Sequence, residues 1–185
     1  IEAANLMHVI DRRSGLPVAI GIIYLHVAAQ MGWTASGVDF PGRFLLRLDA
    51  EDGRLIFDPF DGGRIVSASD LRKMLKSISG PNAELNQNHY RKASWRAVLL
   101  RLQNNIKTRH LNSGSFGAAL EILETMVALA PDDGVLWREV GTLHARLDQV
   151  PAAVAALEQC LRHRTSEQNL YEAAVLLQEL RSRLH

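Results

Sequence analysis

Three residues near the start of the sequence stand where proteins often place reactive groups, but two of them are of types that cannot react. Pro17 precedes a long apolar run that is typical of a helix, and a helix N-terminus activates a thiol by favouring the thiolate. Proline carries no nucleophile, and Arg43, which begins a predicted strand, stays protonated at any working pH. Asp58, at the end of the next strand, is the only one of the three that can exchange a proton. We therefore expect a scaffold that holds a partner and performs no reaction.

Two nearby hydroxyl groups offer a weaker route to catalysis. Ser14 and Thr34 lie close in sequence to the start of the apolar helix. A hydroxyl needs an adjacent base before it can attack a substrate, and the obvious position for that base is occupied by Arg43. We interpret Ser14 as a loop or capping residue.

The charged residues around this region leave two interpretations open. We expect Arg12, Arg13 and Arg43 to converge with Asp58 and Asp61. In one interpretation the arginines clamp an anionic group, such as a carboxylate or a phosphate. In the other, Arg43 simply pairs with Asp58 and the arrangement is structural, which is the interpretation that we favour.

The elements that position these residues are those of an α+β fold. Apolar periodicity, turn residues and a Ser67/Asp70 capping box predict helices over 3–12, 18–31 and 67–77 and strands over 36–39, 43–48 and 54–57. The turn between the last two strands is expected at 51–53. Because the helix over 18–31 is apolar nearly all round, we expect it to be buried, with His26 as a hydrogen-bonded core residue.

After residue 90 the sequence becomes entirely helical, with a repeat of 34 residues. Gly114, Ala119, Leu123 and Pro131 recur as Asp148, Ala153, Leu157 and Thr165, which is the tetratricopeptide period. Trp137, Gly141 and Ala153 fall where such a repeat places one large and two small residues. The predicted helices are 94–111, 115–129, 134–147, 151–163 and 167–183. Because so few repeats do not stand alone, we expect them to pack on the first half.

Composition narrows the class of protein. The chain has 185 residues, a net charge of +1 and a single cysteine, so it has the size for one or two domains and no intrachain disulfide. We expect a cytoplasmic protein with no membrane segment, since the longest apolar run is too short to span a bilayer. The start at Ile1 predicts missing upstream residues.

Metal and nucleic-acid sites are weakly supported. The seven histidines are scattered without ligand spacing, so we expect no metal or other cofactor. Cys160 falls at a small-residue packing position and is predicted to be buried and inert. The stretch 85–120 contains no acidic residue and accumulates the basic residues Arg91, Lys92, Arg96, Arg101, Lys107 and Arg109. Such a helix either meets an acidic surface or a nucleic acid, or is solvated or paired with acids elsewhere in the fold.

Several motifs in order carry a resemblance to a known family. They are Asn5-Leu6, Asp11-Arg12-Arg13-Ser14-Gly15-Leu16-Pro17, Phe40-Pro41-Gly42-Arg43-Phe44-Leu45 and Phe57-Asp58-Pro59-Phe60-Asp61-Gly62-Gly63. With the helical tail, they resemble the bacterial SirB-type transglutaminase-like proteins over nearly the whole chain. The resemblance implies a transglutaminase-like (papain-like) α+β core over 1–90 and a tetratricopeptide-like helical array over 91–185. It also implies that Pro17 and Arg43 replace the Cys and His of a thiol enzyme. Family members usually carry His at the position of Arg43.

These observations favour a non-catalytic module that binds a protein or a peptide through its helical tail or its vestigial site. One alternative is a cysteine-independent hydrolase or acyltransferase of the same fold. A second alternative is an accessory protein that binds nucleic acid through the basic helix, with a steep dependence on salt. The partner, the pathway and the oligomeric state stay open.

Overall fold

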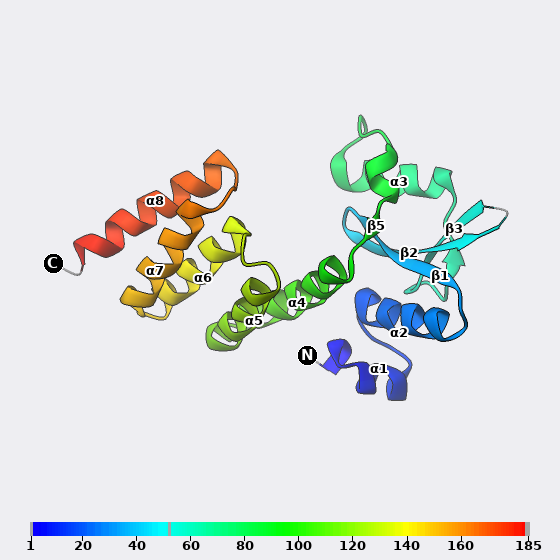
Figure 1. Cartoon of the computed structure of the whole chain (residues 1–185), viewed down its shortest axis with the longest axis horizontal. Helices are drawn as coiled ribbons and strands as arrows, with labels where there is room; N and C mark the ends of the chain where they lie inside the picture. The colour runs from blue at the N-terminus through cyan, green and yellow to red at the C-terminus, as the bar shows by residue number, and fades with distance from the viewer. Residues whose placement is uncertain (1, 52, 184–185) are drawn as a thin grey trace. The chain divides into compact units, whose positions relative to one another are not determined.

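The computed structural model describes residues 2–51 and 53–183, and the chain divides into two compact units at residues 102 and 103 (Figure 1). The division differs from the boundary that we expected after residue 90. The chain beyond that residue still contributes strand β5 (Lys92–Ala93) and the start of helix α4 (Trp95–Asn112) to the first unit. Val98 of α4 is buried in the same cluster as Phe44, so the first core holds the chain past residue 90. Asp52, in the predicted turn, and His185 lie outside the described residues.

The described part of the N-terminal unit forms a five-stranded antiparallel sheet with the order β4-β3-β2-β1-β5. The other strands are β1 (Thr34–Phe40), β2 (Arg43–Ala50), β3 (Gly53–Asp58) and β4 (Arg64–Ile65). The first three confirm the predicted strands and extend them. Strands β4 and β5 have two residues each, too few for an alternating pattern to show in the sequence.

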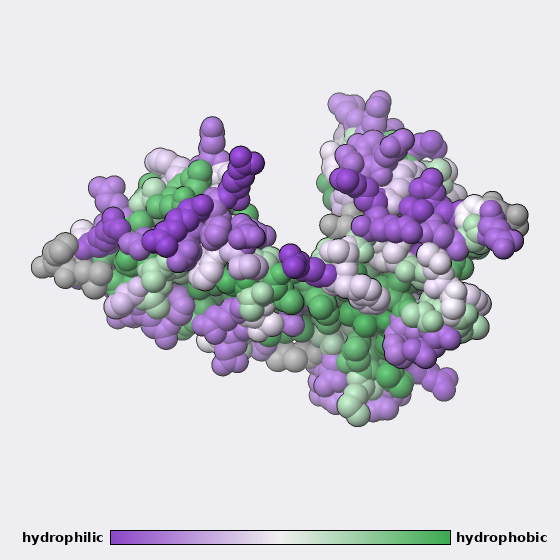
Figure 2. Space-filling view, in the orientation of Figure 1, coloured by the Kyte–Doolittle hydropathy of each residue, from purple (hydrophilic) through white to green (hydrophobic). Residues whose placement is uncertain are grey.

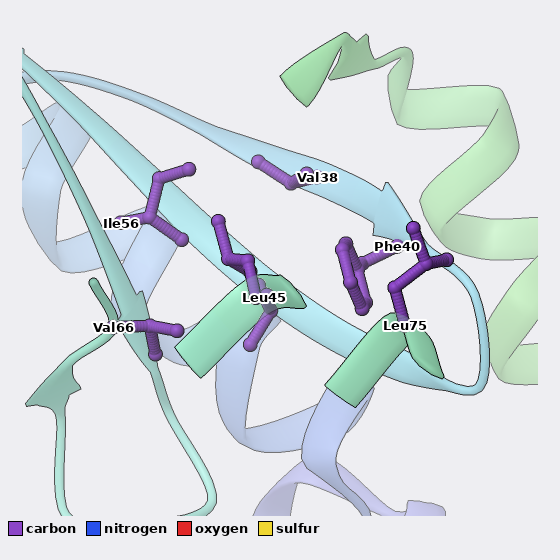
Figure 3. Close-up of a cluster of buried hydrophobic side chains, with 7 residues drawn as sticks. Val38, Phe40, Leu45, Ile56, Val66 and Leu75 are labelled. Carbon is purple, nitrogen blue, oxygen red and sulfur yellow. The ribbon is translucent and has the colours of Figure 1, made fainter. Parts of the chain in front are cut away.

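Helices cover both faces of this sheet because successive side chains of β2 point to opposite sides. Phe44 and Leu46 pack with helix α2 (Pro17–Gln30), while Leu45 lies on the opposite face under helix α3 (Ala68–Ser79). Figure 1 shows the two helices on opposite sides of the sheet. The cluster on the α3 side, drawn in Figure 3, consists of Val38, Phe40, Leu45, Ile56, Val66, Leu71 and Leu75.

Helix α2 is buried along one face only, which corrects the expectation of a wholly buried helix. Val18 and Leu25 lie in the core, but Tyr24 and Val27 are exposed. His26 is exposed as well, so it is not the core histidine that we expected. The apolar composition of α2 therefore leaves a hydrophobic strip uncovered, together with exposed residues of α1 (Leu6–Arg12) such as Ile10.

Local capping signals place the helix ends correctly. Ser67 and Asp70 form the predicted capping box at the start of α3, and the hydroxyl of Ser94 accepts a hydrogen bond from Ala97 N at the start of α4. Short-range hydrogen bonds of this kind satisfy N–H groups that the helix itself leaves unpaired. They depend only on neighbouring residues, which is why the sequence is sufficient to find them.

All regular elements in the described part of the second unit are helices. It contains the end of α4 followed by α5 (Phe116–Leu129), α6 (Gly134–Arg146), α7 (Val150–Arg162) and α8 (Glu167–Ser182). These bounds agree with the predicted helices to within one residue at each end.

The 34-residue repeat is confirmed by matching backbone and burial. Gly114 and Asp148 both adopt positive φ, at 73° and 59°, and Ala119 and Ala153 are both fully buried. A Cβ on Gly141 would lie 2.6 Å from Leu157 Cγ, so α6 and α7 approach more closely than a side chain there allows. This explains the small residue that the repeat places at that position.

The structure contains no helix, within its described residues, that has both the length and the apolar character to cross a bilayer.

Candidate functional site

The N-terminus of α2 is a position where a helix could activate a thiol, but it carries no reactive side chain. Pro17 is the first residue of α2, where its missing N–H costs nothing because that N–H has no partner within the helix. Leu16 precedes it as the N-cap and provides no side-chain hydrogen bond. The position that would activate a thiol is therefore filled by a ring that only directs the chain into the helix.

Arg43 and Asp58 meet at one end of the sheet. Arg43 is the first residue of β2 and Asp58 the last of β3, and the two strands are antiparallel neighbours. Arg43 Nε lies 2.9 Å from Asp58 Oδ2. The Asp58 side chain is fully buried, whereas that of Arg43 is 40% exposed. The geometry agrees with the structural interpretation, in which these two residues pair with each other.

The surroundings of Asp58 define what this carboxylate does. Its Oδ1 accepts a hydrogen bond of 2.9 Å from Phe60 N, which holds the turn after β3. Its Oδ2 faces Arg43 as an ion pair but receives no well-aligned hydrogen bond. A buried carboxylate is tolerated only beside an opposite charge, and a guanidinium cannot take or return a proton. The guanidinium therefore balances the buried charge of Asp58 and cannot act as the histidine of a proton relay.

Two other members of the predicted cluster, Arg12 and Asp61, form ion pairs with residues outside it. Arg12 Nη1 lies 2.5 Å from Glu2 Oε2, and Arg64 Nε lies 2.6 Å from Asp61 Oδ2. The sequence carries a signal for the Asp61–Arg64 pair, because the two residues are three positions apart around a glycine turn. Arg13 lines a cavity formed by α1, α2 and the turn after β3.

Ser14 shares its surroundings with a histidine that no sequence motif predicts there. His8 and Ser14 both line a small cavity of about 150 Å³, and the buried Nδ1 of His8 has no hydrogen-bond partner among the described residues. Among the described residues, no hydrogen bond joins Ser14 and His8. The hydroxyl thus has an imidazole nearby without the contact that general-base activation requires.

The chain's one cysteine lies in the core of the helical unit. Cys160 is fully buried with Ala153 and Leu157. Burial raises the pKa of its thiol, since the thiolate loses its hydration there. Within the described residues, no group of three or more His, Cys, Asp or Glu is arranged to hold a metal ion.

We expect Cys160 to resist Ellman's reagent in the native protein and to react fully once the protein is denatured. Only the thiolate reacts, and both burial and the raised pKa suppress it. The measurement is the rate of thiol release with and without denaturant, with free glutathione as the reference. Native labelling as fast as that of glutathione would show an accessible, reactive thiol instead.

Grooves lie between helices in the described part of the helical unit. One, of about 490 Å³, lies between α4 and α6, and its lining includes the polar residues Asn104, Thr108 and Thr142. Lys107 at this groove is 5% exposed and forms an ion pair with Glu139. The second groove, of about 510 Å³, lies among α5, α6 and α7 and includes Ala152, Ala155, Ala156 and Trp137 in its lining.

Three of the basic residues predicted in the stretch 85–120 contact other groups of the protein. Lys92 Nζ lies 2.7 Å from Asp49 Oδ2, Lys107 pairs with Glu139, and Arg101 contacts Phe40 O and the ring of Phe44. The Lys92 ammonium also lowers the pKa of Asp49, together with the guanidinium of Arg47. These contacts favour the interpretation that the basic residues pair with groups elsewhere in the fold.

Each part of the chain matches a family of known proteins. Residues 1–104 match the model of the transglutaminase-like superfamily, and residues 106–178 match a tetratricopeptide repeat model. A UPF0162 protein of Xylella fastidiosa strain Temecula1 is 30% identical over 168 residues, covering 89% of this chain and 60% of that protein. Protein SirB1 of Salmonella typhimurium is 27% identical over 171 residues, covering 90% of this chain and 63% of SirB1.

A solved tetratricopeptide repeat domain protein from Salinibacter ruber has a TM-score of 0.41 and 21% identity, covering 45% of this chain and 96% of that one. The chain spans about 60% of the length of the curated relatives reported above. The family models, the relatives and the order of the two units together place this chain in the transglutaminase-like superfamily, as a SirB-type protein with a tetratricopeptide region.

Proposed function

We propose that this protein is a non-catalytic binding module that recognises a protein or peptide segment. The observation that carries the proposal is the Arg43–Asp58 ion pair. In a thiol enzyme the acid orients a histidine that accepts a proton from the nucleophile. Here Pro17 supplies no nucleophile and the acid faces a permanent cation, so the frame remains without the proton transfer.

The groove between α4 and α6 is the surface that we propose for the partner. Its volume of about 490 Å³ falls in the range of roughly 300–1,000 Å³ that is usual for ligand sites. Asn104, Thr108 and Thr142 are exposed, and their side chains can hydrogen-bond to the backbone of an incoming segment. Stacked helical repeats use extended grooves of this kind for binding.

The test is a pair of variants that fill one groove each. Thr142→Trp places a large ring in the α4–α6 groove, and Ala155→Trp does the same in the other groove, both at exposed positions. We expect a partner captured from a bacterial lysate by the wild type, then purified and titrated, to bind Thr142→Trp at least about tenfold more weakly. Its affinity for Ala155→Trp should not change.

Two outcomes would contradict the proposal. Equal affinity for both variants would exclude the α4–α6 groove. A hydrolase or acyltransferase activity of the purified protein that disappears in Asp58→Asn would favour the enzymatic alternative. Melting temperatures of both tryptophan variants serve as the control that the helical unit is intact.

A further inference from the structure

A further cavity lies in the N-terminal unit, beside the turn that follows Asp58. Its volume is about 430 Å³, and it opens between α1, α2 and the turn after β3. Figure 2 shows hydrophobic side chains gathered over α1 and α2 on the face that it displays. The residues that line the cavity are Val9, Ile10, Arg13, Ile20, Ile23, Tyr24, Pro59, Phe60 and Gly62.

Hydrogen bonds to the buried Asp58 hold the turn after β3, which forms one wall of this cavity. Asp58 Oδ1 accepts a hydrogen bond from Phe60 N, and Asp58 O accepts one from Gly63 N, each of 2.9 Å. Phe60 is nevertheless exposed at the surface of the turn. The ring of Tyr24 packs against Phe57 with centroids 5.9 Å apart, which supports a second wall. The backbone of Phe60 and the ring of Tyr24 are thus held in place before any ligand arrives.

The charge at this cavity comes from one arginine. Of the described residues that line it, Arg13 is the one charged residue. Its side chain is exposed and has no hydrogen bond or ion pair in the described part of the chain. Its neighbour Arg12 is tied to Glu2. A free guanidinium at the rim of an apolar cavity is complementary to a carboxylate, which it can bind through two parallel hydrogen bonds.

We propose that this cavity binds the C-terminal end of a polypeptide whose last residue is large and apolar. The terminal carboxylate pairs with the guanidinium of Arg13. The last side chain lies among Ile10, Tyr24 and Phe60. In this arrangement Asp58 is a positioning residue, since it holds the turn that presents Phe60. The site is separate from the groove of the helical unit and does not depend on it.

The test uses a fluorescent hexapeptide that ends in phenylalanine, in a free-acid form and a C-terminal amide form, titrated against the full chain by fluorescence anisotropy. We expect saturable binding of the acid and at least about tenfold weaker binding of the amide, because the charge-assisted hydrogen bonds are lost. Arg13→Asn should weaken the acid peptide by a similar factor. Asparagine tolerates the left-handed backbone at this position, where Arg13 has a φ of 52°. The melting temperature should therefore be maintained.

Arg12→Asn is the matched control, since it removes the same charge one residue away. Equal binding of acid and amide, equal losses in Arg12→Asn and Arg13→Asn, or no saturable binding would overturn the proposal. Competition by 4-phenylbutyrate as strong as that of the peptide would assign the cavity to small free acids and reject a chain end. Thr142→Trp should leave this peptide unaffected, so failure here is distinct from failure of the proposed function.

Discussion

The Arg43→Met variant is expected to unfold with a free energy about 2–3 kcal/mol lower than that of the wild type. Methionine keeps much of the length of the side chain and removes the cation that lies 2.9 Å from the fully buried Asp58. The remaining carboxylate is then an uncompensated buried charge, which is among the most costly single defects. The expected loss is below that of a wholly buried pair because Arg43 is 40% exposed and water can reach its place.

A double-mutant cycle with Asp58→Asn distinguishes this cause from lost packing. Asparagine keeps an oxygen for the Phe60 N–H and removes the charge. Asp58→Asn should destabilise the wild type, because the guanidinium of Arg43 loses its partner. The same substitution should stabilise the Arg43→Met background, because it removes the unpaired charge. The measurement is urea unfolding of the four proteins followed by circular dichroism.

Additive effects of the two substitutions would contradict this account. They would mean that Arg43 acts through its aliphatic stem and that the charges do not interact. Arg64→Met provides a reference for an ion pair at the surface. Arg64 and Asp61 approach to 2.6 Å, closer than Arg43 and Asp58, yet both are solvated. We expect a much smaller change for that variant, since solvent screens an exposed pair.

The elements that the sequence predicts well are those that depend on nearby residues. The helix bounds of the second unit follow from 3.6-residue periodicity and from a repeat in which Gly114 and Asp148 take the same left-handed backbone. The pairing of Arg43 with Asp58 was also predictable, because a hairpin brings the start of one strand to the end of the next. In each case a pattern within a short segment determines the result.

The features that the sequence did not predict depend on distant contacts. Strand β5 exists because Lys92 and Ala93 pair with β1, far away in the sequence. The exposure of His26 depends on which face of α2 the sheet covers, and an apolar helix gives little indication of that. The cavity beside Arg13 requires α1, α2 and the turn after β3 to meet. No pattern within one element contains that information.

In the helical unit, Glu139→Ala is expected to lower the free energy of unfolding by about 3 kcal/mol, whereas Lys107→Met should change it by less than about 1 kcal/mol. The two residues form one ion pair, but their burial differs: Lys107 is 5% exposed and Glu139 has a side chain that is 32% exposed. Removing Glu139 leaves an unpaired ammonium group that is largely buried. Removing Lys107 leaves a carboxylate that can hydrate, and methionine fills the vacated space with apolar atoms.

The asymmetry is the informative result, because a pair with equal contributions from both partners would give equal losses. Glu139→Gln is the matched variant: it keeps the shape and an acceptor oxygen for the Lys107 ammonium and lacks the charge, so its loss should lie between the other two. Urea unfolding with unchanged m-values gives the ranking. If Lys107→Met proved the more damaging change, the ammonium would be stabilising the α4–α6 contact through more than Glu139. If the predicted order holds, Lys107→Met alters the charge of the proposed groove at little cost in stability, and its effect on partner affinity then reports recognition directly.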